Sequence, residues 1–355
     1  MKRNLSRIIA LLLAAFLFAA CTPAAGPAPA NPAPAAPDDT ADPAAPSDPA
    51  APSETQEQIR IGVAMSSLKT PFFAAMLQGM ENTRDGQFPH MVLTFQDAQD
   101  DGNIQLNQIE TFVTQGMDVI MVNPAVDAVE PAIQAATDLG IPVILLNRDI
   151  TNPDKSAYFS YVGADNVEMG RQLARMLIQM MGEKDLDGCR VIYMQGELGA
   201  PNQTQRQSGF DEIMATEAAT HNIEILDRYN TRHDKGRVLS AMQNYLNMYG
   251  PGEIDAIVTE GPFEAVAVVE ALIDAGRTEL LGSVMGMDMP TEVWDMIVAG
   301  ELYGTVLQDP AEQGILGLHA VDQLFSGDKD SIPKWIKTEV PIVTRQNAEQ
   351  HPPVW

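Results

Sequence analysis

The feature that most constrains the fold is a regular alternation of short apolar runs and helix-forming segments, which begins at Ile59–Phe73. The run Ile59–Met65 is rich in β-branched residues, as expected of a strand buried on both faces of a parallel sheet. After a polar loop, the hydroxyl of Thr70 can cap a helix whose first position suits Pro71. Because open α/β sheets bind ligands at the carboxyl ends of their strands, we expect this loop at the mouth of a site.

The alternation continues in two series that together reach residue 344. Apolar runs predict further strands at 91–95, 119–124, 142–146, 190–194, 223–228, 256–259, 283–287, 303–307 and 340–344. Helical segments separate most of them, and alternating strands and helices predict parallel sheets with right-handed crossovers. We therefore expect an α/β protein with two similar Rossmann-like lobes, each a parallel sheet flanked by helices, facing each other across a ligand cleft.

The first 57 residues differ in composition from the rest. Basic residues precede an apolar run that ends at Ala20, which predicts a secretory signal over Met1–Ala20. The sequence Phe18-Ala-Ala-Cys21 is similar to a bacterial lipoprotein box, in which the cysteine is lipidated; the alternative is an ordinary cleaved signal with a chance cysteine. Residues 22–57 are almost wholly Ala, Pro, Ser, Thr and Asp, a composition typical of a tether without a core.

Charge and motifs exclude several classes of function. A formal net charge of −26 argues against nucleic acid as a partner, because a phosphate backbone requires a basic footprint. The sequence has no Gly-rich nucleotide-binding motif and no G-x-S-x-G elbow. Its five histidines are scattered, with no zinc-binding spacing, and the sequence singles out no pair of acids for acid–base catalysis. We expect no enzyme activity, no metal and no cofactor.

Hydrogen-bonding side chains instead recur at successive strand ends. They suit a neutral ligand rich in hydroxyl groups, because charged side chains make the stronger hydrogen bonds and aromatic rings cover C–H faces. Phe72 and Phe73 are neighbours on a helix and point in different directions, so we expect that they do not both serve the core. The candidate ligand-binding residues are Ser66, Phe72, Phe73, Asn147, Arg148, Arg206, Glu260, Asp288 and Gln308.

These residues lie in short motifs that resemble the periplasmic sugar-binding proteins of the ribose-binding type, which share their two-lobed fold with the ligand domains of the lactose-repressor family. The likeness runs from about Ile59 to Val343. Its marks are S-S-L-K-T-P-F-F at 66–73, V-N-P at 122–124, I-P-V-I-L-L-N-R at 141–148, A-D-N at 164–166, Q-R-Q-S-G-F at 205–210, M-D at 287–288 and Q-D-P at 308–310.

The resemblance implies roles for individual residues. The family's cleft serine and phenylalanines carry over to Ser66, Phe72 and Phe73, and its sugar-hydroxyl contacts to Arg148, Arg206, Asp288 and Gln308. It also implies a hinge of three crossings, near Ala164, Gln308–Asp309 and Ile336–Val340. The expected division is therefore 1–20 signal peptide, 21–57 lipidated cysteine and linker, 58–164 plus 309–337 N-terminal lobe, and 165–308 plus 338–347 C-terminal lobe.

Departures from the family's motifs bear on which ligand binds. Thr70 replaces an asparagine, Asn147 an aspartate and Met287 an aromatic residue, and Gly261-Pro262 replaces an Asn-Asp pair. Glycine offers no side chain, so one polar arm of the cleft is missing at Gly261, although Glu260 could lean in. We therefore expect ribose to bind less tightly than a larger hexose, a cyclitol or an open-chain polyol.

The sequence leaves two functions open. The first is a lipid-anchored, extracytoplasmic and monomeric solute-binding protein that delivers a monosaccharide or polyol to an ABC permease. The second is a sensory module that presents the bound sugar to a chemoreceptor or sensor kinase. Both would use the same cleft residues.

Overall fold

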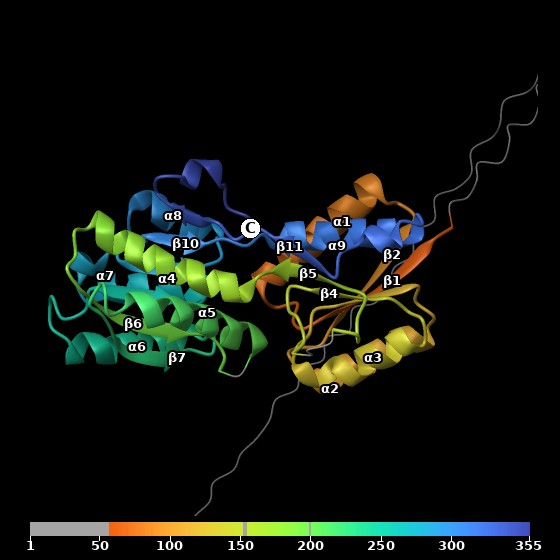
Figure 1. Cartoon of the computed structure of the whole chain (residues 1–355), viewed down its shortest axis with the longest axis horizontal. Coiled ribbons are helices and arrows are strands. Elements are labelled where there is room, and N and C mark those ends of the chain that lie inside the picture. The colour runs from red at the N-terminus through yellow and green to blue at the C-terminus, as the bar shows by residue number, and fades with distance from the viewer. Residues whose placement is uncertain (1–56, 152–154, 199) are drawn as a thin grey trace, which may run out of the picture. The chain divides into compact units, whose positions relative to one another are not determined.

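The computed structural model describes residues 57–151, 155–198 and 200–355 (Figure 1). The predictions for the signal sequence Met1–Ala20, for lipidation at Cys21 and for the linker up to residue 56 lie outside these residues. By their internal contacts, Thr55–Trp355 form a single unit, and the fold described below belongs to it. Within the described residues, no helix has the length and apolar character needed to cross a membrane.

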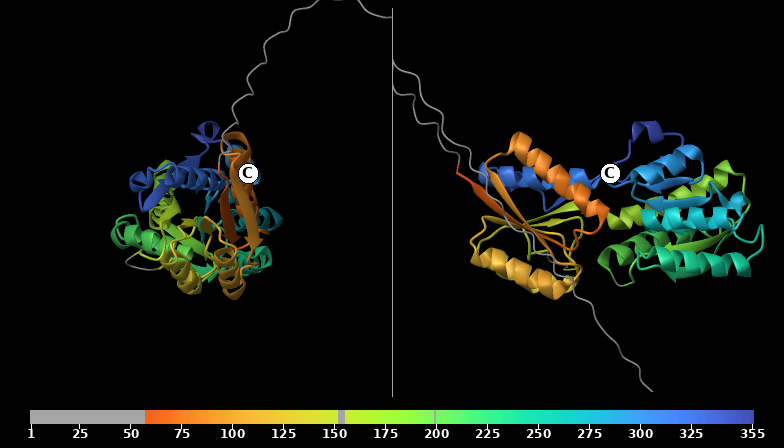
Figure 2. Two further views of the ribbon diagram at one scale, coloured as in Figure 1. Left: turned by 90° about the vertical axis from the view of Figure 1, so that its right-hand side faces the viewer. Right: turned by 180° about the vertical axis from the view of Figure 1, so that it is seen from behind.

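The first sheet has six strands in the order β11-β5-β4-β3-β1-β2, and all its strand pairs are parallel. Helices cover both of its faces (Figure 2). The strands are β1 Ile59–Met65, β2 Met91–Asp97, β3 Val119–Val122, β4 Val143–Leu146, β5 Ser160–Ala164 and β11 Trp335–Thr338, and the helices are α1 Pro71–Gln87, α2 Gly102–Thr114, α3 Glu130–Asp138 and α9 Pro310–Phe325.

Alternation along the central strands explains why they read as continuous apolar runs. In β3, Val119 and Met121 point into the core beneath α1 and α9, whereas Ile120 and Val122 point into the core beneath α2 and α3. Successive strand residues face opposite sides, so a strand covered on both faces needs apolar residues at every position. The prediction that Ile59–Met65 form a strand buried on both faces is confirmed for all its residues except the exposed Arg60.

The second sheet repeats this plan with the order β12-β10-β9-β8-β6-β7. Its β6 alternates in the same way, with Ile192 and Met194 in one core and Val191 and Tyr193 in the other. The strands are β6 Cys189–Gln195, β7 Ile223–Asn230, β8 Ala256–Thr259, β9 Val284–Met287, β10 Gly304–Val306 and β12 Ile342–Thr344, and the helices are α4 Asn166–Glu183, α5 Pro201–Glu217, α6 Lys235–Met248, α7 Pro262–Asp274 and α8 Thr291–Ala299.

The strand β5 was not predicted, although all of its residues are buried. Three further details differ from the expectations. First, β12 pairs antiparallel with β10, so the second sheet is not wholly parallel. Second, the edge strand β11 was not predicted, because its alternation covers only four residues and includes the exposed Lys337. Third, Thr70 occupies the capping position of α1 but its hydroxyl makes no capping bond, whereas Pro71 does begin the helix.

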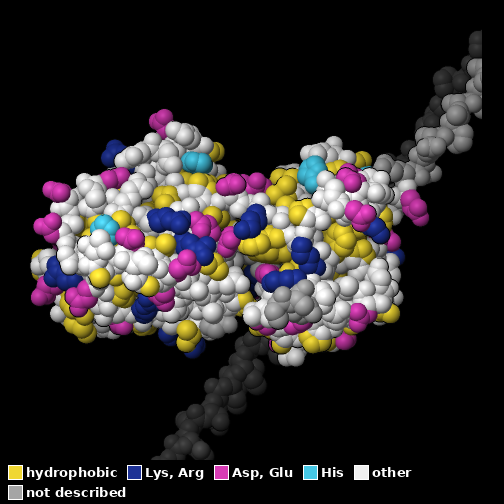
Figure 3. Space-filling view, in the orientation of Figure 1, with side chains coloured by type: hydrophobic (Ala, Val, Ile, Leu, Met, Phe, Trp, Pro, Cys, Tyr) yellow, Lys and Arg dark blue, Asp and Glu magenta, His cyan; other side chains and the backbone are white. Residues whose placement is uncertain are grey.

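The chain passes from one sheet to the other three times. It leaves the first sheet after β5, returns through α9 to β11, and then enters β12 of the second sheet. The domain boundaries and hinge residues given above stay predictions. On the face shown in Figure 3, acidic and basic side chains are interspersed over both halves, with no continuous basic surface.

Candidate functional site

A cavity of about 330 Å³ lies where strand ends of both sheets meet. This volume falls at the lower end of the usual range for small-molecule sites, which is about 300–1,000 Å³. Its wall takes residues from the loops after β1, β2 and β4 of the first sheet and after β7, β8, β9 and β10 of the second. The sheets thus offer their carboxyl ends to one space, as ligand sites of open α/β sheets do.

Eight of the nine residues predicted from the sequence line this cavity. They are Phe72, Phe73, Asn147, Arg148, Arg206, Glu260, Asp288 and Gln308. The ninth, Ser66, is fully buried and is not among the lining residues; its hydroxyl donates to Asn123 Oδ1 at 2.5 Å. Ser66 therefore ties the end of β1 to the end of β3 in this structure, and the ligand-binding roles of all nine stay predictions.

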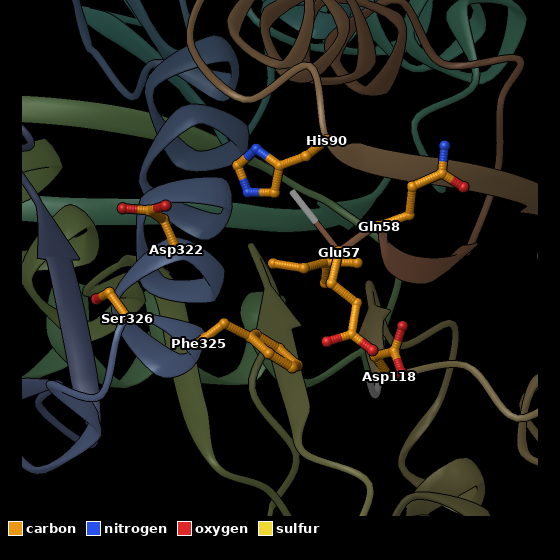
Figure 4. Close-up of a pocket in the computed structure, with 8 residues that line it drawn as sticks. Glu57, Gln58, His90, Asp118, Asp322, Phe325 and Ser326 are labelled. Carbon is orange, nitrogen blue, oxygen red and sulfur yellow. The ribbon is translucent and has the colours of Figure 1, made fainter. Parts of the chain in front are cut away.

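Another cavity of similar size, about 350 Å³, lies around the amino end of β1 (Figure 4). Glu57, His90, Asp118, Asp322 and Phe325 are among the residues that line it. It lies at the opposite end of β1 from the predicted site, and none of the predicted ligand residues lines it. We therefore take the strand-end cavity as the candidate site.

The apolar side of the candidate site consists of aromatic rings. The rings of Phe72 and Phe73 stand edge to face with centroids 5.4 Å apart, and Trp355 stands edge to face with Phe72 at 5.3 Å. Both phenylalanines are buried and also belong to the core under α1 and α9. The expectation that they would not both serve the core is wrong, because each ring packs inward with one side and lines the cavity with another.

Two arginines supply positive charge to the cavity wall. The Arg148 guanidinium carbon lies 5.5 Å from the Phe73 ring centroid, within range of a cation–π contact, and its Nη1 donates to the Pro124 carbonyl at 3.3 Å. Burial lowers the pKa of Arg148, Asp100 acts in the opposite direction, and the charge of Arg206 lowers the pKa further.

Two hydrogen bonds to residues near the second sheet hold the Arg206 side chain in place. Its Nε donates to Asn166 Oδ1 at 3.0 Å and its Nη1 to the Glu260 carbonyl at 3.1 Å. For the third nitrogen, Nη2, the sulfur of Met169 at 4.0 Å is the one hydrogen-bond partner among the described residues. A thioether sulfur is a weak acceptor, so Nη2 keeps capacity to donate to a ligand.

Two buried acids lie on the same wall. Both oxygens of Glu260 are engaged, by the Tyr193 hydroxyl at 2.5 Å and the Gly196 amide at 2.8 Å. Asp288 Oδ1 accepts from Gln308 at 2.8 Å, and no described residue makes a hydrogen bond to its other oxygen. Burial raises the pKa of Glu260, and it also raises the pKa of Asp288 although Arg206 opposes the shift. Of these two buried acids, Asp288 is therefore the one with an oxygen to which no described residue makes a hydrogen bond.

An amide network joins the two sheets at the back of the cavity. Asn147 Nδ2 donates to Gln313 Oε1 at 3.0 Å and to Gln308 Oε1 at 3.3 Å, and Gln308 in turn donates to Asp288. Asn147 and Asp288 follow β4 and β9, one in each sheet, and both have a positive φ, of 62° and 66°. Asparagine and aspartate tolerate this conformation better than most residues.

Several lining residues were not predicted as ligand residues. They are Ser67, Lys69, Thr70, Pro71, Asp100, Asn202, His233, Gly261, Pro262, Phe263 and Trp355. The strand-end rule could have found His233, but the prediction ended the strand before it at residue 228, whereas β7 runs to Asn230. No periodicity in the sequence points to Trp355. Among the described residues, no group of three or more His, Cys, Asp or Glu side chains could hold a metal ion.

Comparison with known proteins decides the family. The model of the periplasmic binding protein domain matches residues 61–329. The chain belongs to the periplasmic binding protein family. This binding protein is 27% identical over 295 residues to the ribose import binding protein RbsB of Bacillus subtilis, with 83% of this chain and 90% of the relative covered. It is 26% identical over 292 residues to the xylitol-binding protein of Mycolicibacterium smegmatis, covering 82% and 78%.

Solved structures agree on the fold. A solute-binding protein of an ABC transporter from Bacillus halodurans, with bound myo-inositol, matches with a TM-score of 0.72 at 26% identity, covering 84% of this chain and 99% of the other. A galactofuranose-binding protein gives the same TM-score at 22% identity, covering 82% and 96%. These findings confirm the two-lobed α/β fold and the resemblance to ribose-type proteins. The relatives are binding proteins and not enzymes, and the family implies an extracytoplasmic location for this binding protein.

Proposed function

We propose that this protein binds a monosaccharide or polyol in the strand-end cavity and delivers it to an ABC importer. The observation that carries the proposal is the composition of the cavity wall, which combines aromatic rings with charged side chains from the neighbourhood of both sheets. The named relatives include a ribose import binding protein, a xylitol-binding protein and a structure with bound myo-inositol. All three ligands are small, neutral and rich in hydroxyl groups.

The wall suits such a ligand chemically. The free donor capacity of Arg206 and the free acceptor of Asp288 can engage a hydroxyl, which both donates and accepts. Phe72, Phe73 and Trp355 can cover the C–H faces of the same molecule. Charge-assisted hydrogen bonds contribute about 1.5–3 kcal/mol each, so a few of them account for specific binding of a small polar solute.

We further propose that the ligand is enclosed by closure of two lobes, 58–164 with 309–337 and 165–308 with 338–347. The hinge would consist of the three crossings near Ala164, Gln308–Asp309 and Ile336–Val340, since hinges lie at the ends of elements. Small-angle scattering should show a more compact particle with saturating ligand, and identical profiles would contradict closure.

We also propose that lipid on Cys21 holds the protein at the outer face of the cell membrane.

A thermal-shift screen tests the binding step. At about 100 times its dissociation constant a ligand adds about 2.7 kcal/mol to the free energy of unfolding, which is easily seen as a rise in melting temperature. The panel should include D-ribose, xylitol, myo-inositol, D-allose and D-fructose, followed by calorimetry of every hit. We expect at least one hit that binds more tightly than ribose. A panel without any shift would overturn the proposal.

Variants locate the site. Arg206→Ala should abolish the shift, because it removes a cavity donor, whereas Arg175→Ala should leave it unchanged. Arg175 is a suitable control because it lies on the surface of α4 and pairs with Glu168 at 2.6 Å.

Delivery is tested in cells: deletion of the gene should abolish uptake of the labelled sugar. Normal uptake with a lost response to that sugar would instead favour the sensory role.

A further inference from the structure

His233 enters the candidate site from the end of β7 with a buried carboxylate directly behind it. The imidazole Nδ1 lies 2.6 Å from Glu264 Oε1, and the same oxygen accepts from the Thr231 hydroxyl at 2.9 Å. The side chain of Glu264 is fully buried, whereas that of His233 is 41% exposed and lines the cavity. The carboxylate therefore fixes Nδ1, whereas no described residue makes a hydrogen bond to Nε2.

Two glycines, Gly196 and Gly261, pack closely against this pair. A Cβ on Gly196 would lie 2.7 Å from Cε1 and Nε2 of His233, and a Cβ on Gly261 would collide with Glu264 Oε2. That oxygen is buried and has no hydrogen-bond partner among the described residues. Gly261 itself lines the cavity. Glu264 thus occupies the volume that a side chain at residue 261 would otherwise fill, and His233 packs against Gly196.

The charges around the imidazole favour its protonated form. Burial opposes protonation, but the hydrogen bond and the charge of Glu264 outweigh it, so the pKa of His233 is raised from its ordinary value. Glu260 at the end of β8 acts in the same direction, whereas Arg206 from α5 opposes it. Asp288, at the end of β9, also interacts electrostatically with the ring. The hydrogen bond from His233 likewise lowers the pKa of Glu264, against the effect of its burial.

We propose that His233 and Glu264 form the second polar arm of the cleft, in which His233 Nε2 donates to an oxygen of the bound sugar or polyol and Glu264 positions the ring. This inference rests on the proposed function. It also corrects the expectation that Gly261 leaves that arm empty: the polar group comes from residues 233 and 264 instead. Glu260 does not take this place, because a carboxylate can only accept, whereas this arm donates; its oxygens also already accept from Tyr193 and Gly196.

Protonation decides what this arm can do. A neutral imidazole that donates from Nδ1 to Glu264 has only an acceptor at Nε2, whereas the imidazolium donates from both nitrogens. A charge-assisted hydrogen bond is about twice as strong as a neutral one. Ligand affinity should therefore fall as the pH rises through the pKa of His233.

Calorimetry with xylitol, myo-inositol and D-ribose on the full-length protein tests the proposal. His233→Gln should weaken the tightest of the three by about tenfold or more, as expected when a charge-assisted hydrogen bond is lost. The wild-type affinity should fall about fivefold or more between about pH 6 and pH 9, and this fall should vanish in His233→Gln. Glu264→Gln keeps an acceptor for the ring but removes the charge, so it should move the same fall to lower pH.

His221→Gln is the matched control. His221 precedes β7, whose other end leads to His233, and its Nε2 lies 3.4 Å from a carboxylate oxygen of Glu217 in a partly exposed contact. Its substitution should change neither the affinity nor the pH profile. If a sugar binds but His233→Gln leaves affinity and pH profile unchanged, this inference is wrong while the proposed function stands. If no compound of the whole thermal-shift panel binds, the proposed function fails and the inference with it.

Discussion

The indole of Trp355 stands edge to face with the ring of Phe72, with the centroids 5.3 Å apart and the planes at 81°. Phe72 belongs to α1 beside the first sheet, whereas the Trp355 carbonyl accepts from the amide and hydroxyl of Thr291, where α8 begins beside the second. Trp355 therefore joins the two halves at the rim of the cavity. Its Nε1 is buried and has no hydrogen-bond partner among the described residues.

We expect Trp355→Ala to weaken sugar binding about five- to twentyfold, because it removes a wall of the cavity and an aromatic contact of about 0.5–1.5 kcal/mol beyond its buried area. Trp355→Phe keeps a ring against Phe72 but lacks the N–H, so a loss in this variant too would assign the effect to Nε1. Calorimetry measures both. Trp294→Phe is the control, since Trp294 donates to the Ala348 carbonyl and does not line the cavity. Equal affinities in all variants would contradict a role for Trp355.

The sequence predicted most central strands, although it missed β5, and it predicted the edge strands less well. Central strands such as β3 are covered on both faces, and their apolar runs are unmistakable. The edge strand β7 has no fully buried position, so its pattern was too polar to show that it continues to Asn230. The edge strand β11 was missed for a similar reason.

The same limit applies to the candidate site. Residues that follow central strands directly, such as Asn147 and Asp288, were found, because the end of such a strand is easily recognised. His233 follows an edge strand and was missed. Trp355 reaches the cavity through tertiary contacts with Thr291 and Phe72, which no local pattern reveals.

The amide network behind the cavity predicts a cost for Asn147→Asp. Aspartate tolerates the positive φ of this position, but it cannot donate to Gln308 and Gln313 as Asn147 does. Leaving a buried polar group unpaired costs about 1–3 kcal/mol, and we expect the free energy of unfolding to fall by that amount in urea titrations. Asn222→Asp is the control, because Asn222 also has a positive φ but makes a single exposed bond to the Asp187 carbonyl. A more stable Asn147→Asp variant would show that the glutamine amides turn to donate to the new carboxylate.

The packing of Glu264 against Gly261 predicts that even the smallest side chain is harmful there. Gly261→Ala would place its Cβ on the Glu264 carboxylate, which is held by Thr231 and His233. Overpacking of this kind costs about 1–3 kcal/mol, measurable as a lower urea midpoint. Gly86→Ala is the matched control, because no atom lies within 4 Å of its Cβ position and it lies in α1. That substitution should raise stability by about 0.5–1 kcal/mol, as expected of alanine for glycine in a helix. Equal stability of Gly261→Ala and wild type would show that Glu264 can move aside.

The proposed lipid anchor predicts opposite behaviour for the two cysteines of the chain. Cys21→Ser should shift the protein from the membrane fraction to the soluble fraction, because two acyl chains on one residue hold a protein stably where a single chain is marginal. Cys189→Ser should leave the membrane fraction unchanged, since Cys189 is buried in β6 and burial raises the pKa of its thiol to about 12, which keeps it unreactive. Fractionation after labelling with a radioactive fatty acid measures both properties at once. Label and membrane association that persist in Cys21→Ser would show that the chain is anchored by some other means.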